Sequence, residues 1–240
     1  MTYILVRYFL PNFLSTTSLL PNNRRKPRKM MNFAYFLAAV SFLFLNSVAT
    51  AQGPTTVNVS AMNYSDLTSS GLIDLQGFIS LPKIVPAPAV VIIPDWDGVN
   101  FYEQQRATMI AKDLGYVAFA ADIYGAEKHN VDNITERVEL AGYYRGNSTL
   151  FSQRIKAAVD FVKSQPEVDA NNVALIGYCF GGTGVLQYGL LGGVGVVAIA
   201  SFHGGLVNFT ESSSGFQPKL LVLSGGDDDT STSIMDLENT

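Results

Sequence analysis

The stretch Val173-Ala174-Leu175-Ile176-Gly177-Tyr178-Cys179-Phe180-Gly181-Gly182 decides the fold class of this chain. It begins with an apolar run, continues through a glycine-rich turn, and leads into residues 182–191, which have helical spacing. An apolar run of this kind predicts a strand buried on both faces. The order of strand, tight turn and helix around G-x-C-x-G is the cysteine counterpart of the turn G-x-S-x-G, whose central residue is a nucleophile. We therefore interpret Cys179 as a nucleophile at the end of a buried strand.

The turn has the residues that a nucleophile at this position needs. Gly177 and Gly181 stand two residues from Cys179 on either side, where a tight turn leaves no room for larger side chains. The positive N-terminus of the following helix is expected to favour the thiolate over the thiol. The alternative is a buried structural cysteine at a strand end. Cys179 is the sole cysteine of the chain, which excludes an intramolecular disulfide and a cysteine-based zinc cluster.

Strand and helix patterns alternate along the sequence from residue 52 onward. The predicted strands are residues 56–60, 72–80, 89–94, 116–123, 173–177, 194–202 and 219–224, with a turn at 69–71 between the first two. The predicted helices are 102–114, which stops at Gly115, 133–163 and 182–191. Strands separated by helices indicate βαβ units. We therefore expect one domain with a three-layer α/β fold, a mostly parallel sheet and helices on both faces.

Residues 1–51 have the pattern of an N-terminal extension followed by a signal peptide. A basic cluster at 24–29 precedes an apolar run at 33–45, and Ala49-Thr50-Ala51 follows. The run is about 13 residues long, which suits a signal peptide and is short for a membrane span. We predict cleavage after Ala51, which leaves residues 52–240 as the folded domain. The alternatives are an uncleaved signal anchor and, for the basic cluster alone, a nucleic-acid or nuclear-import patch.

Charge and glycosylation motifs bear on the partners and the compartment. The chain has a net charge of -4, from 16 Lys+Arg against 20 Asp+Glu, so we expect no nucleic-acid partner. After signal cleavage we also expect no stable membrane partner. Five Asn-x-Ser/Thr motifs favour a secreted glycoprotein or one of the endomembrane lumen, since such motifs are acceptors in exported proteins. They begin at Asn58, Asn63, Asn133, Asn147 and Asn208.

Three segments resemble one known family. They are residues 169–182, which include the cysteine turn, Ser201-Phe202-His203-Gly204-Gly205-Leu206, and Pro94-Asp95-Trp96-Asp97-Gly98-Val99-Asn100. In these segments the chain resembles the dienelactone hydrolase family of α/β-hydrolases. The resemblance implies hydrolysis of lactone or small ester bonds by a Cys-His-Asp triad, with no metal and no organic cofactor. It implies a small-molecule lactone or ester as the partner and leaves the oligomeric state open.

The resemblance also implies roles for individual residues. Cys179 would be the nucleophile, and the acid would be Asp228 in Ser224-Gly225-Gly226-Asp227-Asp228-Asp229, with Asp227 and Asp229 as alternatives. The backbone N–H groups of Trp96 and Phe180 would form the oxyanion hole. The residues themselves agree with part of this placement. Asp95, Cys179 and the acidic run all follow predicted buried strands, and ligands of open α/β sheets bind at those strand ends.

Three further residues are assigned to the substrate pocket. Asp95 stands where the family commonly has a glutamate near the nucleophile. His203 would form part of the pocket wall, and its alternative role is that of the catalytic base. Arg154 lies on the predicted helix before the cysteine turn, where relatives often carry an arginine; the alternative is a surface charge on that helix. His129 is interpreted as a solvated loop residue. No metal site is expected among these residues.

The triad histidine of the family pattern does not follow Asp228 in this sequence. It would lie about 30 residues later, whereas the printed sequence ends at Thr240, and its two histidines both precede Asp228. We therefore expect a fold that lacks the last strand and helix, with the strand at 219–224 unpaired on one side. A second functional hypothesis follows: a catalytically impaired or non-catalytic scaffold that binds small molecules. A third is a redox role for Cys179, although the chain has no resolving cysteine.

Overall fold

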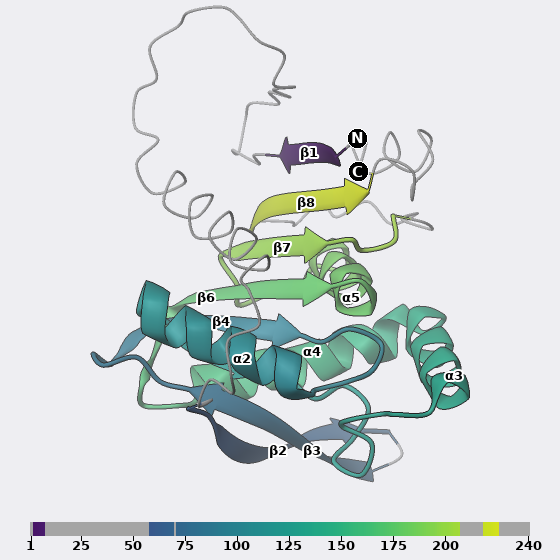
Figure 1. Cartoon of the computed structure of the whole chain (residues 1–240), viewed down its shortest axis with the longest axis horizontal. Coiled ribbons are helices and arrows are strands. Elements are labelled where there is room, and N and C mark those ends of the chain that lie inside the picture. The colour runs from purple at the N-terminus through teal and green to yellow at the C-terminus, as the bar shows by residue number, and fades with distance from the viewer. Residues whose placement is uncertain (1, 8–57, 70, 207–217, 226–240) are drawn as a thin grey trace, which may run out of the picture. The chain divides into compact units, whose positions relative to one another are not determined.

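The computed structural model describes residues 2–7, 58–69, 71–206 and 218–225 (Figure 1). The strands in these ranges are β1 Thr2–Arg7, β2 Ser60–Thr68, β3 Gly71–Ser80, β4 Ala87–Ile93, β5 Val117–Ala120, β6 Val168–Tyr178, β7 Ala198–Phe202 and β8 Lys219–Gly225. They form one sheet in the order β1-β8-β7-β6-β4-β5-β3-β2. The five strands from β8 to β5 in that order pair in parallel, and β1, β3 and β2 join antiparallel.

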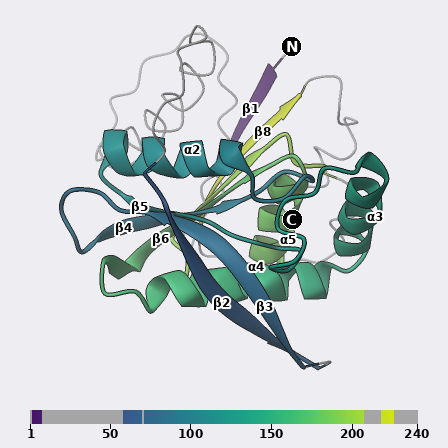
Figure 2. The same cartoon turned by 60° about the horizontal axis from the view of Figure 1, so that its bottom comes forward.

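Helices cover both faces of this sheet. They are α2 Phe101–Met109, which continues as the π-helical turn η2 Ile110–Leu114, then α3 Ile134–Arg145, α4 Ser148–Lys163 and α5 Phe180–Leu190. Figure 2 shows α2 on one face of the sheet and α4 and α5 on the other. The predicted three-layer α/β fold with a mostly parallel sheet is therefore confirmed. None of the helices within the described ranges is both long enough and apolar enough to span a bilayer.

Asparagine side chains determine where three of the helices begin. Asn100 caps α2 in a capping box with Glu103, Asn133 caps α3, and Asn147 caps α4. The cap at Asn147 divides the predicted helix 133–163 into α3 and α4. At the other end of α2–η2, Gly115 has a φ of 73°, so the predicted stop at this glycine is confirmed.

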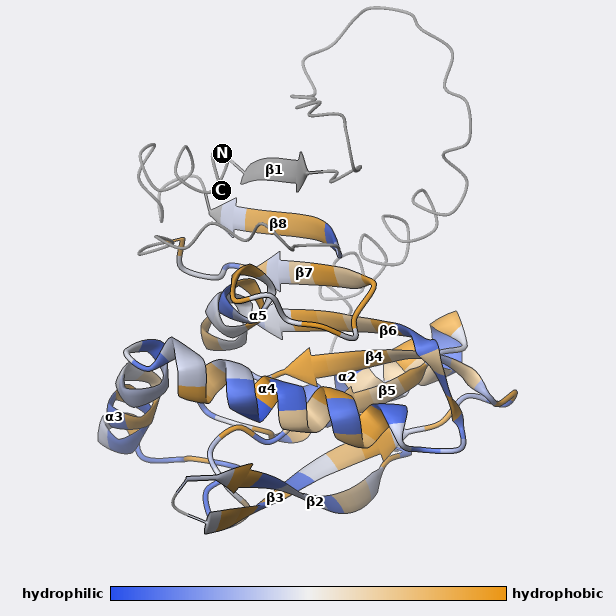
Figure 3. Cartoon of the chain, turned by 180° about the vertical axis from the view of Figure 1, so that it is seen from behind, coloured by the Kyte–Doolittle hydropathy of each residue, from blue (hydrophilic) through white to orange (hydrophobic). Residues whose placement is uncertain are grey.

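The core lies between the parallel strands and the helices. In β4 the side chains of Val91, Ile92 and Ile93 are fully buried, as the apolar run predicted. The apolar stripe of α4 is buried as well, since Ile155, Ala158, Val159 and Val162 are all 0% exposed. Figure 3 shows the same division, with orange strands in the parallel region and both orange and blue segments along α4.

The position of the first predicted strand is wrong. The structure places β2 at Ser60–Thr68, and of the predicted range 56–60 only Ser60 belongs to the strand among the described residues 58–60. β2 pairs antiparallel with β3, with Thr68 opposite Gly71. The inward positions of β2 include Tyr64 and Asp66, which are 8% and 5% exposed. Because one inward residue is an aspartate, the alternation of apolar and polar residues that marks a strand is broken.

The edge at β8, which was predicted to be unpaired, is paired. β1 lies antiparallel to β8, with a register that runs from Thr2↔Gly225 to Arg7↔Leu220. β1 belongs to the stretch that the sequence assigned to the N-terminal extension, and its run Thr2-Tyr3-Ile4-Leu5-Val6 has high strand propensity. The predicted cleavage position after Ala51 lies outside the described residues, and that boundary stays a prediction.

Candidate active site

Cys179 lies in the turn between β6 and α5 with a strained backbone. Its φ of 47° and ψ of -103° are unusual for a residue with a side chain, and such strain often marks functional sites. The Cys179 N–H donates to the Phe202 carbonyl at 2.8 Å, and the Thr183 N–H donates to the Cys179 carbonyl at 3.0 Å. The neighbouring strand β7 and the first turn of α5 therefore hold the cysteine in this conformation.

The glycines around Cys179 are required by close backbone contacts. A Cβ added to Gly177 would overlap the carbonyl of Gly181, and a Cβ added to Gly181 would overlap the carbonyl of Ile93 at the end of β4. The steric explanation of the G-x-C-x-G pattern is thereby confirmed. Gly182 is restricted too, because its Cβ would come within 2.8 Å of the Gly204 Cα.

The Cys179 side chain is half-buried, and its surroundings favour the neutral thiol. Burial, the negative charge of Asp95 and a hydrogen bond from the thiol to the Asp95 carboxylate raise the pKa of Cys179, whereas Arg145 and the Phe180 N–H act to lower it. The helix N-terminus was predicted to favour the thiolate, and in the resting protein this contribution is outweighed. The helix contributes in the expected direction, but burial and the nearby carboxylate outweigh it.

Asp95 connects the nucleophile to one of the two predicted oxyanion donors. It follows β4 and is half-buried, and its Oδ1 accepts the Trp96 N–H at 2.6 Å. The negative charge of the same carboxylate is close enough to Cys179 to raise the pKa of its thiol. Asp95 therefore acts electrostatically on the nucleophile. Of the two predicted donor groups, the Phe180 N–H acts to lower the pKa of Cys179, and the Trp96 N–H is bonded to the Asp95 carboxylate.

Arg145 is the arginine at the nucleophile. It ends α3, and its exposed guanidinium brings Nη2 to 3.8 Å from the Cys179 Sγ and Cζ to 5.7 Å from the centre of the Phe180 ring. Sequence reasoning missed this residue, because it stands 34 positions from Cys179. The local signal was limited to a basic residue in the last turn of a helix, and basic residues are common there.

Arg154, which was assigned to the substrate pocket, lies in a buried ion pair. Its Nη1 is 2.6 Å from Asp66 Oδ2, its Nε donates to the Tyr144 hydroxyl at 3.5 Å, and the residue is 4% exposed. The pair joins α4 to β2. The alternative interpretation of Arg154 as a surface charge is wrong, because the guanidinium is enclosed within the protein.

Aromatic side chains form a cluster beside the cysteine turn. The Phe180 ring lies 5.4 Å from Tyr124 and 6.4 Å from Tyr144, and it stacks on Phe151 at 4.5 Å, centre to centre. The Tyr124 hydroxyl donates to the Trp96 carbonyl at 2.9 Å. Burial raises the pKa of Tyr124, so this hydroxyl stays protonated and acts as a donor.

The two histidines occupy different places. Tyr178 pairs with Phe202, so Cys179 and His203 follow directly after paired positions of β6 and β7. His203 also has a positive φ, of 60°, and its side chain is exposed. His129 lies in the loop after β5, half-buried, with Nδ1 at 2.8 Å from the Ala126 carbonyl. The structure therefore places His203, rather than His129, at the strand edge that carries the nucleophile.

The predicted acid lies outside the described residues. Asp228 and its alternatives Asp227 and Asp229 follow β8, whose last residues pair along the end of β7, with Phe202 opposite Leu223. β8 therefore ends at the same edge of the sheet as β6 and β7. In the described parts of the chain, no cluster of three or more His, Cys, Asp or Glu side chains is placed to hold a metal ion.

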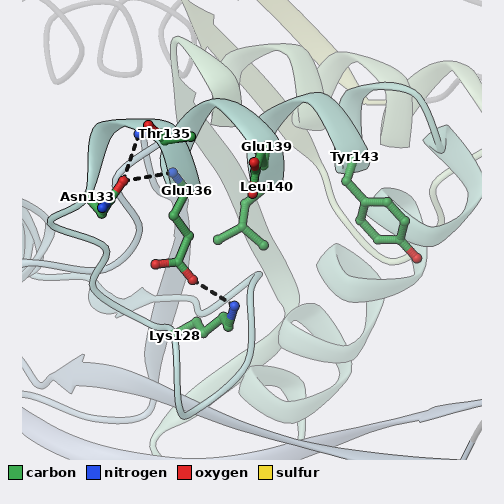
Figure 4. Close-up of a pocket in the computed structure, with 7 residues that line it drawn as sticks. All are labelled: Lys128, Asn133, Thr135, Glu136, Glu139, Leu140 and Tyr143. Carbon is green, nitrogen blue, oxygen red and sulfur yellow. Dashed lines mark hydrogen bonds and ion pairs between the residues drawn. The ribbon is translucent and has the colours of Figure 1, made fainter.

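One surface cavity of about 580 Å³ lies beside α3 and not at Cys179. It is lined by Lys128, Asn133, Thr135, Glu136, Glu139, Leu140 and Tyr143. Figure 4 shows an ion pair between Lys128 and Glu136, 2.7 Å long, and the Asn133 cap of the helix. None of the predicted site residues lines it. The chemistry of the strained cysteine, not the volume of this cavity, therefore identifies the candidate active site.

Comparison with known proteins agrees with this geometry. The sequence profile of the dienelactone hydrolase family matches residues 75–240. A Bradyrhizobium sp. protein, provisionally named a 2-oxo-3-(5-oxofuran-2-ylidene)propanoate lactonase, is 28% identical over 124 residues, covering 51% of this chain and 49% of that protein. A Synechocystis sp. protein, provisionally named a carboxymethylenebutenolidase, is 29% identical over 137 residues, covering 55% and 54%. This chain spans about half the length of these curated relatives.

Solved structures give the same result. The crystal structure of a dienelactone hydrolase-like promiscuous phosphotriesterase from metagenomic libraries is 30% identical, with a TM-score of 0.67 over 75% of each chain. The structure named m3DLH is 27% identical, with a TM-score of 0.67 over 75% of each chain. With its cysteine turn, its parallel sheet and these matches, the chain belongs to the dienelactone hydrolase family of the α/β-hydrolase superfamily.

Proposed function

We propose that this protein hydrolyses lactones or small carboxylic esters through Cys179. The observation that carries the proposal is the strained, half-buried Cys179 at the N-terminus of α5, with Asp95 and Arg145 at its sulfur. Strained nucleophiles at a strand-to-helix turn are a recurrent feature of acyl-transfer enzymes. A purely structural cysteine does not require a positive φ, a carboxylate and a guanidinium at the same atom.

The proposed reaction has two stages. The thiol of Cys179 passes its proton to the Asp95 carboxylate, the sulfur bonds to the acyl carbon, and the carbonyl electron pair moves to oxygen. The N–H groups of Phe180 and Trp96 stabilise this oxyanion. Collapse breaks the bond to the alkoxide, which takes the proton from Asp95 and leaves a thioester. Water then hydrolyses the thioester, which releases the carboxylic acid product and restores the thiol. Asp228 is the proposed triad carboxylate that assists these proton transfers.

The substrate is proposed to carry a negative charge near the scissile bond. The exposed Arg145 guanidinium stands 3.8 Å from the nucleophilic sulfur, within reach of a substrate carboxylate bound beside it. The name of the Bradyrhizobium relative describes a lactone that bears a propanoate group. An anionic lactone therefore fits both the charge at the site and the chemistry attributed to a relative.

Replacement of Cys179 tests the proposal. Cys179→Ala is expected to lower the turnover of p-nitrophenyl acetate and of an anionic enol lactone by about 10³-fold or more, as removal of a nucleophile does. The control is Lys156→Ala, which removes an exposed ion pair with Asp160 on the outer side of α4. Turnover that survives in Cys179→Ala, in protein with an unchanged circular dichroism spectrum, would refute the assignment.

A second candidate function is ligand binding with little or no turnover. The raised pKa of Cys179 favours it, because a thiol that keeps its proton needs a base before it can attack. General-base assistance contributes about 10²- to 10⁴-fold to such reactions. This candidate predicts that the anionic lactone protects Cys179 from alkylation yet is recovered unchanged, with no acyl-enzyme seen by mass spectrometry. An acyl-enzyme that forms and decays would exclude it.

We further propose passage through the secretory pathway, on the basis of the apolar run at 33–45 and the glycosylation motifs. Asn133 and Asn147 are exposed, and both cap their helices through Oδ1. A glycan on Nδ2 would leave these caps in place. Expression in a secretory cell line should yield a protein whose mobility shifts on treatment with a peptide N-glycosidase; an unshifted, cell-retained protein would contradict export.

A further inference from the structure

The peptide groups on either side of Trp96 are both held by hydrogen bonds to their carbonyls. The Asp95 carbonyl accepts the Gly98 N–H at 3.0 Å, and the Trp96 carbonyl accepts the Tyr124 hydroxyl at 2.9 Å. Gly98 is constrained in turn, because a Cβ at this position would overlap the His129 carbonyl. The Trp96 N–H cannot turn to another partner without breaking these contacts. Its direction is therefore set by the backbone, and only its acceptor can change.

The loop around this peptide is also tied to its neighbour. The Val99 N–H donates to the His129 carbonyl at 2.5 Å, and the Val131 N–H donates to the Asp97 carbonyl at 2.9 Å. These two bonds join residues 97–99 to residues 129–131. An oxyanion donor needs this kind of rigidity, since its value in catalysis comes from being oriented before the charge develops.

In the resting protein the acceptor of this fixed donor is a carboxylate. Asp95 Oδ1 takes the Trp96 N–H at 2.6 Å, a short bond of the charge-assisted kind. Asp95 is half-buried. An oxyanion and a carboxylate cannot share the one N–H, because like charges at this distance repel strongly in a partly buried site.

We propose that Asp95 blocks the oxyanion hole of the resting protein and must rotate away from the Trp96 N–H before the hole can receive the substrate carbonyl oxygen. This inference rests on the proposed hydrolase function. The movement needs rotation about the side-chain bonds of Asp95 alone, because hydrogen bonds from the Gly98 N–H and the Tyr124 hydroxyl hold the backbone in place. Asp95 thereby acts on the reaction twice, as the partner of the Cys179 thiol and as the group that the developing oxyanion displaces.

The chain offers a direct probe of this arrangement. Trp96 is its only tryptophan, so protein labelled with ¹⁵N-tryptophan has a single labelled backbone amide. Asp95→Asn keeps a neutral acceptor of the same shape, whereas Asp95→Ala removes the acceptor. We expect the Trp96 amide proton to resonate furthest downfield in the natural protein, to move upfield in Asp95→Asn, and to move further in Asp95→Ala. Asp113→Ala, which removes an exposed carboxylate of η2, is the control and should leave the resonance unchanged.

A second measurement uses a trifluoromethyl ketone that adds reversibly to Cys179. The thiol loses its proton to the solvent, the sulfur bonds to the ketone carbon, and the carbonyl electron pair moves to the oxygen, which then accepts the Trp96 N–H. Both Asp95 variants lack the carboxylate charge. A difference between their affinities for the ketone therefore reports whether the side chain at position 95 occupies the Trp96 N–H. Asp95→Ala should bind the ketone about tenfold or more tighter than Asp95→Asn, within the range that one oxyanion donor contributes.

The outcomes separate this inference from the proposed function. Equal ketone affinities in the two variants, together with an amide resonance that Asp95→Ala does not move, would overturn the blocked oxyanion hole even if esters are hydrolysed. An amide that shifts as expected and a ketone that distinguishes the variants would support it even if no ester is turned over. In that case the hydrolase proposal fails and the blocked donor stands.

Discussion

Replacement of Arg154 distinguishes a residue of the core from a residue of the substrate pocket. Arg154→Met keeps most of the side-chain volume and leaves Asp66 buried without its cation. The two side chains are 5% and 6% exposed and their charged atoms are 2.6 Å apart, so solvent cannot replace the lost partner. Breaking such a buried pair costs about 3–5 kcal/mol. The bond from Gln153 Nε2 to Asp66 Oδ1, 3.1 Å long, remains, which places the expected loss near the lower end, at about 3 kcal/mol.

Urea unfolding followed by circular dichroism measures this loss. The double variant Arg154→Met/Asp66→Leu removes both charges and should recover most of the lost stability, because a buried pair is often replaceable by apolar residues. Lys156→Ala, at the exposed pair with Asp160, should change the free energy of unfolding by less than about 0.5 kcal/mol. If Arg154→Met instead unfolds like the natural protein and raises the KM for an anionic lactone, the assignment of Arg154 to the core is refuted.

Two other predictions concern the charge of Arg145 beside Cys179 and the protonation of the buried Glu103. Arg145→Met removes a cation that lowers the pKa of Cys179, so the rate of alkylation by iodoacetamide should rise at higher pH than in the natural protein; an unchanged pH profile would exclude contact between the two side chains. Burial raises the pKa of Glu103, which is 1% exposed, from 4.5 to about 7, so the folded state holds its proton longer than the unfolded state. The free energy of unfolding should therefore fall by about 3 kcal/mol between pH 4.5 and pH 7 because of this group. Glu103→Gln keeps the capping box and should flatten this dependence of stability on pH. Thermal unfolding across that pH range measures the effect.

Structural features that depend on the local sequence pattern could be predicted. The apolar runs of β4 and β6, the stripe of α4 and the stop at Gly115 follow from periodicity and from the conformational freedom of glycine. The strand β2 escaped detection because Asp66 occupies an inward position, and its partner Arg154 stands 88 residues away. Local pattern cannot show that a charged residue is neutralised by a distant one, so the sequence did not reveal the ion pair that holds Arg154 and Asp66.

The sequence by itself determined the α/β architecture and the cysteine turn, because spacing, glycine sterics and strand–helix alternation are properties of short segments. The tertiary structure alone decided which arginine meets Cys179, where Asp95 directs its carboxylate, and that the thiol stays neutral at rest. Each of these depends on the distance and burial of groups brought together from β4, α3 and α5. Electrostatic interactions act through space and through the local dielectric, and no segment of sequence carries that information on its own.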